Sequence, residues 1–237
     1  MRKAGAVVAG LLEHLKTQVR AGITTRQLDE AAVHFLKQAN AKPAFLGYRG
    51  FPATICVSVN EEVVHGIPGP KRINDGDVVS IDAGAVVDGW FSDAAITMVV
   101  GLVPKNIQVL IETTRQALEE GIAKAIVGNR VSDISHAVQA CIDKQGFGIV
   151  RDFVGHGIGR ALHEDPPVPN FGEPNTGPRL KAGMVLAIEP MVTLGGYEVE
   201  LLSDGWTAVT RDRSLAAHFE HTLAITERGA DVLTRLA

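Results

Sequence analysis

The sequence has few cysteines, few aromatic side chains, no long apolar run and no excess of basic residues. Its 237 residues include two cysteines, Cys56 and Cys141, too few for a disulfide framework and consistent with a reducing compartment. Aromatic residues make up 5% of the chain. No apolar stretch approaches the roughly 20 residues that span a bilayer. Lys and Arg number 23 against 27 Asp and Glu, which argues against a nucleic-acid surface.

What the chain has instead is apolar residues, which make up 46% of it and suffice for a sizeable core. The N-terminal stretch Met1–Leu12 is similar to a signal peptide in composition. However, Glu13, His14 and Lys16 interrupt it where a cleavage site would stand, and its apolar residues recur at helical spacing. We therefore expect a helix there and a cytoplasmic protein.

The chain contains an internal repeat. Apolar periodicity predicts two helices in each half, at residues 8–19, 28–36, 104–122 and 134–142. The candidate first residues or N-caps of three of them are Thr24 or Thr25, Pro104 and Ser132. Gly22 and Gly128 lie 106 positions apart, as do apolar residues of the second and fourth helices. This offset indicates that the two halves are related.

The same offset continues into predicted strands. Gly76–Asp82 corresponds to Gly183–Glu189, 107 positions later. The turn segments Asp88–Trp90 and Asp204–Trp206 also correspond. Each begins with Asp-Gly, which is a strong hairpin signal. The strands after these turns are further apart, which predicts an insertion around 210–217 in the second half.

Each half thus has the order helix, helix, strand, strand. Neither half can cover its own sheet, so we expect one α+β domain over 1–237, with halves of roughly 1–100 and 104–237 about a pseudo-twofold axis.

The repeat pairs acidic residues: Asp82 corresponds to Glu189, and Asp93 to Glu220. A twofold relation brings these four carboxylates together near the axis, where they would repel one another unless cations neutralised them. Solvated strand ends are the alternative. That alternative is weak for Asp82 and Glu189, because each one ends an apolar strand.

A fifth candidate ligand is His156, which lies between Gly155 and Gly157. The glycines would allow the backbone to approach a ligand, and imidazole is a common metal ligand. Such a histidine alone is more often a loop or core residue. Together with four carboxylates it predicts a site for Mn, Fe, Co or Zn. Two ions that share carboxylates can activate water and polarise a carbonyl, which is hydrolytic chemistry.

Seven stretches carry a family resemblance that covers nearly the whole chain: Gly47–Pro52, Ser58–Pro68, Gly155–Gly159, His163–Glu164, Ile188–Met191, Asp204–Trp206 and Glu220–Thr222. Together they resemble the type I methionine aminopeptidases. The resemblance implies the pita-bread fold with a largely antiparallel curved sheet, and two divalent ions (Co, Mn, Fe, Zn or Mg). It also implies removal of the initiator methionine from nascent chains when the second residue is small.

The resemblance further implies a role for each site residue. Asp82 would bind one ion, Asp93 and Glu220 would bridge both, and His156 and Glu189 would complete the other ion's ligands. Glu189 would also shuttle a proton. The remaining implied site residues are the catalytic and substrate-binding His65 and His163 and the pocket residues Tyr48, Phe51, Cys56 and Trp206.

The chain departs from the commonest family pattern at three pocket positions. Phe45 replaces a frequent cysteine, Arg49 a frequent histidine and Leu162 a frequent phenylalanine. These differences do not involve the metal ligands. Their effect on the shape of the pocket is not fixed by the sequence. The four histidines expected to be structural are His14, His34, His136 and His218, while His221 is expected to orient a ligand.

Two other interpretations remain. The chain could be an Xaa-Pro peptidase of the same fold, since Asp82-Ala83-Gly84 and Ser92-Asp93 also fit that signature. It could instead be a metal-free binding adaptor, although all five ligand positions are acidic or histidine. The partners we expect are the N-termini of nascent polypeptides, with contact at the ribosome left open, and the expected state is a monomer.

Overall fold

Four amphipathic helices lie where the apolar periodicity predicts them. The structure, a computed structural model, describes residues 1–235. Its helices are α1 (Arg2–Gln18), α2 (Thr25–Gln38), α3 (Lys105–Lys124) and α4 (Val131–Asp143), with one 3-10 turn, η1 (Tyr48–Gly50). Val8, Leu11 and Leu15 form the fully buried stripe of α1, which confirms that the N-terminal stretch is a helix.

The helix starts agree with the sequence at α2 and differ from it at α3 and α4. Thr24 is the N-cap of α2 and forms a capping box. Pro104 is an N-cap rather than the first helical residue of α3. The prediction that Ser132 caps α4 is wrong. The N-cap is Arg130, whose backbone N–H donates to the Asp133 carboxylate at 2.7 Å, and the Ser132 hydroxyl is bonded to the loop backbone instead.

The strands are short except for one long hairpin. They are β1 (Lys42–Pro43), β2 (Ile55–Val59), β3 (Glu62–Val64), β4 (Val78–Val87), β5 (Trp90–Val99), β6 (Gly148–Ile149), β7 (Gly155–Gly157), β8 (Glu164–Val168), β9 (Val185–Ile188), β10 (Met191–Thr193), β11 (Val199–Leu201), β12 (Ala208–Thr210), β13 (Ala216–His218), β14 (Glu220–Thr226) and β15 (Gly229–Val232).

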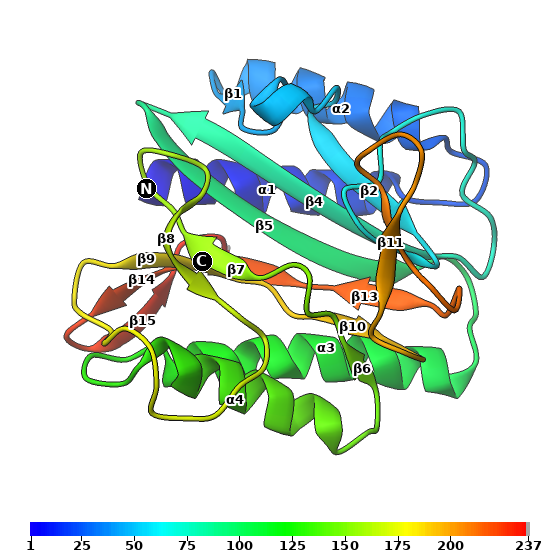
Figure 1. Ribbon diagram of the computed structural model, residues 1–237. Coiled ribbons are helices and arrows are strands. Elements are labelled where there is room, and N and C mark those ends of the chain that lie inside the picture. The colour runs from blue at the N-terminus through cyan, green and yellow to red at the C-terminus, as the bar shows by residue number, and fades with distance from the viewer. Residues whose placement is uncertain (236–237) are drawn as a thin grey trace.

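A nine-stranded sheet runs through both halves of the chain (Figure 1). Its order is β1-β4-β5-β14-β9-β7-β8, with β2 on β4 and β15 on β14. All its strand pairs are antiparallel. The β4–β5 hairpin turns at Asp88 and Gly89, both at positive φ, so the first predicted hairpin is confirmed. In this sheet the two halves join where β5 pairs with β14.

The second half departs from the predicted repeat. Asp204–Trp206 does form a turn, between β11 and β12, but these strands belong to a small separate sheet with β3. On the side of β9 away from β7, the pairing strand is β14, and four strands lie between β9 and β14 in the chain. The extra residues of the second half therefore lie between Glu189 and Glu220, include β11 and β12, and are not confined to 210–217. The Asp-Gly signal is a property of the local turn and does not report which sheet the flanking strands join.

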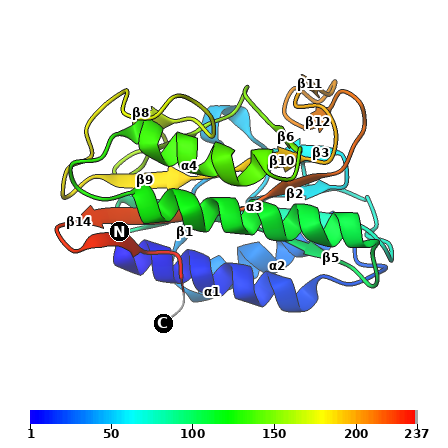
Figure 2. The same cartoon turned by 90° about the horizontal axis from the view of Figure 1, so that it is seen from below.

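The helices cover one face of the large sheet. Val79, Ile81 and Ala83 of β4 pack against α1 and α2, and so do alternate residues of β5. Leu186 and Ile188 of β9 pack in the same way against the second pair of helices. Figure 2 shows the helices together on this side. Because side chains alternate along a strand, the residues between them face the other side of the sheet, where the site lies.

Candidate metal centre and pocket

Sheet register places three acidic side chains on the face opposite the helices. Asp82 of β4 and Glu220 of β14 both pair with Ala95 of β5, from opposite sides. Directly paired residues share a face, and so do residues two apart in one strand. Asp93, two residues before Ala95, therefore lies beside both of the others. These acids thus meet across the seam between the two halves.

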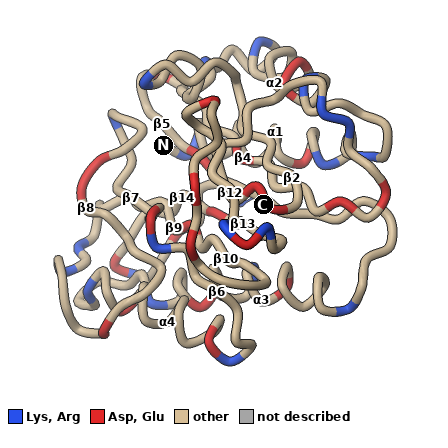
Figure 3. Tube along the Cα trace, turned by 45° about the vertical axis from the view of Figure 1, so that its right-hand side comes forward, with Lys and Arg blue, Asp and Glu red and all other residues tan. Residues whose placement is uncertain are grey.

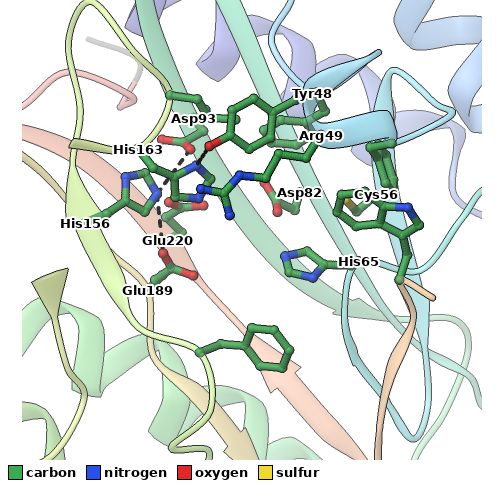
Figure 4. A pocket seen from close by; sticks show the side chains of 15 residues that line it. Tyr48, Arg49, Cys56, His65, Asp82, Asp93, His156, His163, Glu189 and Glu220 are labelled. Atoms are coloured by element: carbon green, nitrogen blue, oxygen red, sulfur yellow. Dashed lines mark hydrogen bonds and ion pairs between the residues drawn. The ribbon is translucent and has the colours of Figure 1, made fainter. Parts of the chain in front are cut away.

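His156 and Glu189 reach the same place from the second half. His156 lies on β7, and Glu189 directly follows β9. The Nε2 atom of His156 lies 3.6 Å from Asp93 Oδ2 and 3.6 Å from Glu189 Oε1 (Figure 4). Its Nδ1 is 2.9 Å from the carbonyl oxygen of Gly157. Nδ1–H therefore donates to that carbonyl, and the Nε2 lone pair faces the carboxylates, as a metal ligand requires.

The glycines around His156 are required by close strand packing. A Cβ on Gly155 would overlap the backbone of Ala187, and one on Gly157 would overlap the backbone of Asp165. These glycines let β7 fit between β9 and β8. This close strand packing places the His156 ring.

The electrostatics of this cluster call for a cation. Burial, reinforced by the neighbouring carboxylates, raises the pKa of Asp82, Glu189 and Glu220 well above their ordinary values. Burial also raises the pKa of Asp93, although His156 and the Thr222 hydroxyl oppose the shift. Asp82 Oδ1 is buried without a hydrogen-bond partner among the described residues.

The donor set fits a divalent metal. Ligand atoms of Asp93, His156 and Glu220 lie within 4.8 Å of one another. Carboxylate oxygens and one imidazole nitrogen suit Mn, Fe, Co and Zn. A bound cation would give the orphaned Asp82 oxygen a partner and would offset the repulsion among the buried acids.

A pocket of about 260 Å³ opens beside the acids. It brings together all eleven site residues proposed from the sequence: Tyr48, Phe51, Cys56, His65, Asp82, Asp93, His156, His163, Glu189, Trp206 and Glu220. Phe45, Arg49, Phe153 and Leu162 also line it. Phe153 was not singled out by sequence reasoning. It packs edge-on against the ring of His65 at 5.2 Å, and only its place three residues before His156 could have indicated it.

One wall of the pocket is apolar. The rings of Phe51 and Trp206 meet edge to face with centroids 5.1 Å apart. Cys56 lies within the same buried cluster, and burial raises the pKa of its thiol, so it is neutral. Both cysteines of the chain are free and buried. This wall suits an apolar side chain of a ligand.

Two histidines flank the acids. His163 Nδ1 lies 2.9 Å from the Tyr48 hydroxyl, and its ring lies 4.2 Å from that of His156. Burial, with His156 and Arg49 nearby, lowers the pKa of His163 to about 4, so the ring is neutral near pH 7. His65 directly follows β3 at φ 61, and burial lowers its pKa as well. Neutral imidazoles here can donate one hydrogen bond each.

Two further histidines lie at positions that the sequence did not indicate. His218, expected to be structural, is 2% exposed, and its Nε2 lies 3.7 Å from Glu189 Oε2. His221, expected to orient a ligand, lies on the opposite face of β14, where its ring bonds to Thr234 at 2.9 Å. Strand alternation explains this, since His221 directly follows Glu220 and must point the other way.

Outside this cluster the charges are dispersed. Figure 3 shows Lys and Arg scattered over outer loops and helices and interspersed with Asp and Glu. Within residues 1–235, the helices include none with the length and apolar character needed to cross a bilayer.

The fold agrees with the comparisons to known proteins. The chain belongs to metallopeptidase family M24, whose family description matches residues 1–227. It is 52% identical to methionine aminopeptidase 1 of Bacillus subtilis over 236 residues, covering 100% of this chain and 95% of that protein. It is 48% identical to methionine aminopeptidase 1 of Mycobacterium tuberculosis, covering 99% of this chain and 91% of that protein.

Solved structures agree with this assignment. The methionine aminopeptidase of Thermotoga maritima superposes with a TM-score of 0.98 at 47% identity, covering 100% of this chain and 95% of that chain. The prolidase of Pyrococcus furiosus has a TM-score of 0.80 at 24% identity, covering 100% of this chain and 63% of that chain. The second likeness bears on the fold alone, and both confirm the expected pita-bread fold.

Proposed function

We propose that this protein is a methionine aminopeptidase that removes the initiator methionine when the next residue is small. The observation that carries the proposal is the placement of five candidate ligands beside an apolar pocket of about 260 Å³. The relatives at about half identity support it, because they are named methionine aminopeptidases and this chain aligns with nearly their full length.

The residues present fit two divalent ions. We propose that Asp82 holds one ion, that Asp93 and Glu220 bridge the two, and that His156 and Glu189 complete the second set of ligands. Ions held there would polarise the scissile carbonyl and activate a water for its attack. Their identity is open among Co, Mn, Fe, Zn and Mg.

The protein's own groups would position the substrate around this centre. The methionine side chain would lie against Phe51, Cys56 and Trp206, since a thioether packs well on aromatic edges. The Tyr48 hydroxyl would donate a hydrogen bond to His163 Nδ1. The Nε2–H group of His163 would then be free to donate a hydrogen bond to the substrate. His65 would supply a second donor. Such donors stabilise the charge that develops on the carbonyl oxygen.

Glu189 would move the proton. In this proposal its carboxylate takes a proton from the attacking water and delivers it to the nitrogen of the leaving amine. The His218 ring, 3.7 Å from Glu189 Oε2, would restrict where that carboxylate can turn. The cleaved amide then yields free methionine and a peptide with a new N-terminus.

The test is a peptidase assay on metal-stripped protein reloaded with each metal in turn. Peptides beginning Met-Ala-Ser and Ala-Pro are compared, and the Glu220→Gln variant is the control. Cleavage of the methionine peptide by the loaded wild type alone supports the proposal. Cleavage of the Ala-Pro peptide instead would identify an Xaa-Pro peptidase. Failure to bind any divalent ion would favour a binding adaptor.

We further propose that the protein acts as a monomer in the cytoplasm on the N-termini of nascent chains. Contact with ribosomes would be tested by co-sedimentation of the purified protein with 70S particles. Light scattering after gel filtration would test the monomer, and a mass of about twice that of the chain would contradict it.

A further inference from the structure

We propose that Arg49 makes the mouth of the pocket a carboxylate-binding subsite, so that substrates with an acidic group shortly after the scissile bond are preferred. This inference rests on the proposed function, because it concerns the part of the peptide that remains after methionine is removed.

The first observation is where the pocket opens. Of its fifteen lining residues, only Arg49 and His163 are exposed, while the others are buried or half-buried. The mouth of the pocket therefore lies at these two residues. A peptide whose first side chain fills the apolar wall, and whose first amide bond lies over the acids, must leave past Arg49.

The second observation is how Arg49 is held. It lies in η1 at φ 49, a conformation uncommon for a residue other than glycine, between Gly47 and Gly50, which both have positive φ. Backbone hydrogen bonds donated by the N–H groups of Tyr48 and Phe51 close this turn. The guanidinium lies 5.4 Å from the centre of the Tyr48 ring. Figure 4 shows the side chain extending over the pocket toward His163.

The third observation concerns charge. Arg49 is the only Lys or Arg in the pocket lining, and its guanidinium makes no ion pair with a described carboxylate among residues 1–235. Two divalent ions would balance the four carboxylates beneath it. The loaded pocket would then keep one uncompensated positive charge at its mouth.

A carboxylate is the ligand that matches this charge. Guanidinium binds carboxylates through two parallel hydrogen bonds, and its stacking on Tyr48 leaves its N–H edge available. The carboxylate could be an Asp or Glu side chain at the third to fifth residue of the substrate, or the C-terminus of a short peptide. Because the pair is exposed, we expect a preference of about two- to five-fold.

The experiment uses the metal-loaded enzyme and peptides of equal length. Amidated Met-Ala-X-Ser-Ser peptides with X as Asp, Asn or Lys are compared by kcat/KM. A second arm compares Met-Ala-Ser with a free and an amidated C-terminus. We expect Asp over Asn over Lys in wild type, with the difference mainly in KM and reduced by added salt. A preference confined to the free C-terminus would identify the chain end as the source of the carboxylate.

Arg49→Gln is the test variant and Arg26→Gln, at an exposed position on α2, is the matched control. In Arg49→Gln the Asp-to-Asn ratio should fall to about one, whereas Arg26→Gln should keep it. Calorimetry with the product peptides Ala-Asp-Ser-Ser and Ala-Asn-Ser-Ser, both amidated, gives the same comparison without turnover. Equal rates for all X in wild type together with equal rates for free and amidated Met-Ala-Ser, or a wild-type preference that is unchanged in Arg49→Gln, would overturn the inference. Failure to cleave any methionine peptide would instead reject the proposed function.

Discussion

At the scale of single residues, the acids at the seam depend on what neutralises them. Asp93 and Glu220 are both nearly fully buried, at 3% and 2% exposure, and neither has an Arg or Lys partner among the described residues. Such groups are stable as anions only beside a cation. Their chemical identity should therefore matter more than their shape.

We predict that Asp93→Asn and Glu220→Gln abolish peptide hydrolysis and weaken metal binding while the fold persists. Each change keeps the size of the side chain and removes one charge from the centre. Peptidase assays and calorimetric metal titrations check the prediction, with circular dichroism for the fold. Glu227→Gln, an exposed change in the turn after β14, is the control. Near-normal turnover by either variant with its metals bound would refute the two-ion assignment.

We predict that His65→Ala and His163→Ala keep their metals but lose rate. Each removes one hydrogen-bond donor to the reacting amide, a loss that costs roughly 10²–10³-fold in kcat at comparable sites. Measuring both kcat and bound metal for each variant distinguishes a hydrogen-bond donor from a metal ligand. Loss of bound metal in either variant would make that histidine a ligand instead.

At the scale of elements, the caps and turns fix where the segments begin. The Thr24 hydroxyl accepts from the Gln27 backbone N–H at 3.2 Å, and the Gln27 side chain accepts from the Thr24 backbone N–H at 2.9 Å. This reciprocal pair satisfies two N–H groups that would otherwise be open at the start of α2.

We predict that Thr24→Ala lowers the free energy of unfolding by about 1 kcal/mol, because it removes the acceptor of the capping box. Urea denaturation of wild type and variant measures the difference. Thr17→Ala, an exposed change near the end of α1, should cost less. A smaller effect for Thr24 than for Thr17 would mean that the cap adds little in this context.

The elements also show what the sequence could and could not predict. Periodicity found all four helices, and the repeat brought Asp82, Asp93, Glu189 and Glu220 together, because both signals report burial that recurs along the chain. The sheet membership of β11 and the position of His218 were missed. Both depend on pairing between residues distant in sequence, which no local pattern encodes.

At the scale of the whole molecule, one sheet and its helices join both halves. We propose that 1–237 form a single domain, and we predict one cooperative unfolding transition. Fluorescence from Trp90 and Trp206, one in each half, should give the same urea midpoint as far-ultraviolet circular dichroism. Two separated transitions would mean that the halves unfold independently.

We also predict that metal binding by the whole protein releases protons, and more of them near pH 6 than near pH 8. The folded pKa values of Asp82, Glu189 and Glu220 lie above the unfolded ones. These carboxyls therefore favour the metal-free fold at low pH and destabilise it as pH rises through their folded pKa values. Metal affinity should fall with falling pH, and chelation should lower Tm more near pH 8. Titration calorimetry in two buffers counts the protons, and a zero count would contradict the prediction.

The pairing of β5 with β14 at Ala95 and Glu220 has a consequence for how such a chain can be divided. A cut in the segment 100–104, between β5 and α3, would leave two fragments, each with a newly open edge in the large sheet and part of the ligand set. The fragment 1–99 would hold Asp82 and Asp93, and the other would hold His156, Glu189 and Glu220. Reassembly would restore a continuous sheet and the ion site in one event. Divalent ions would therefore stabilise the complex of the two fragments.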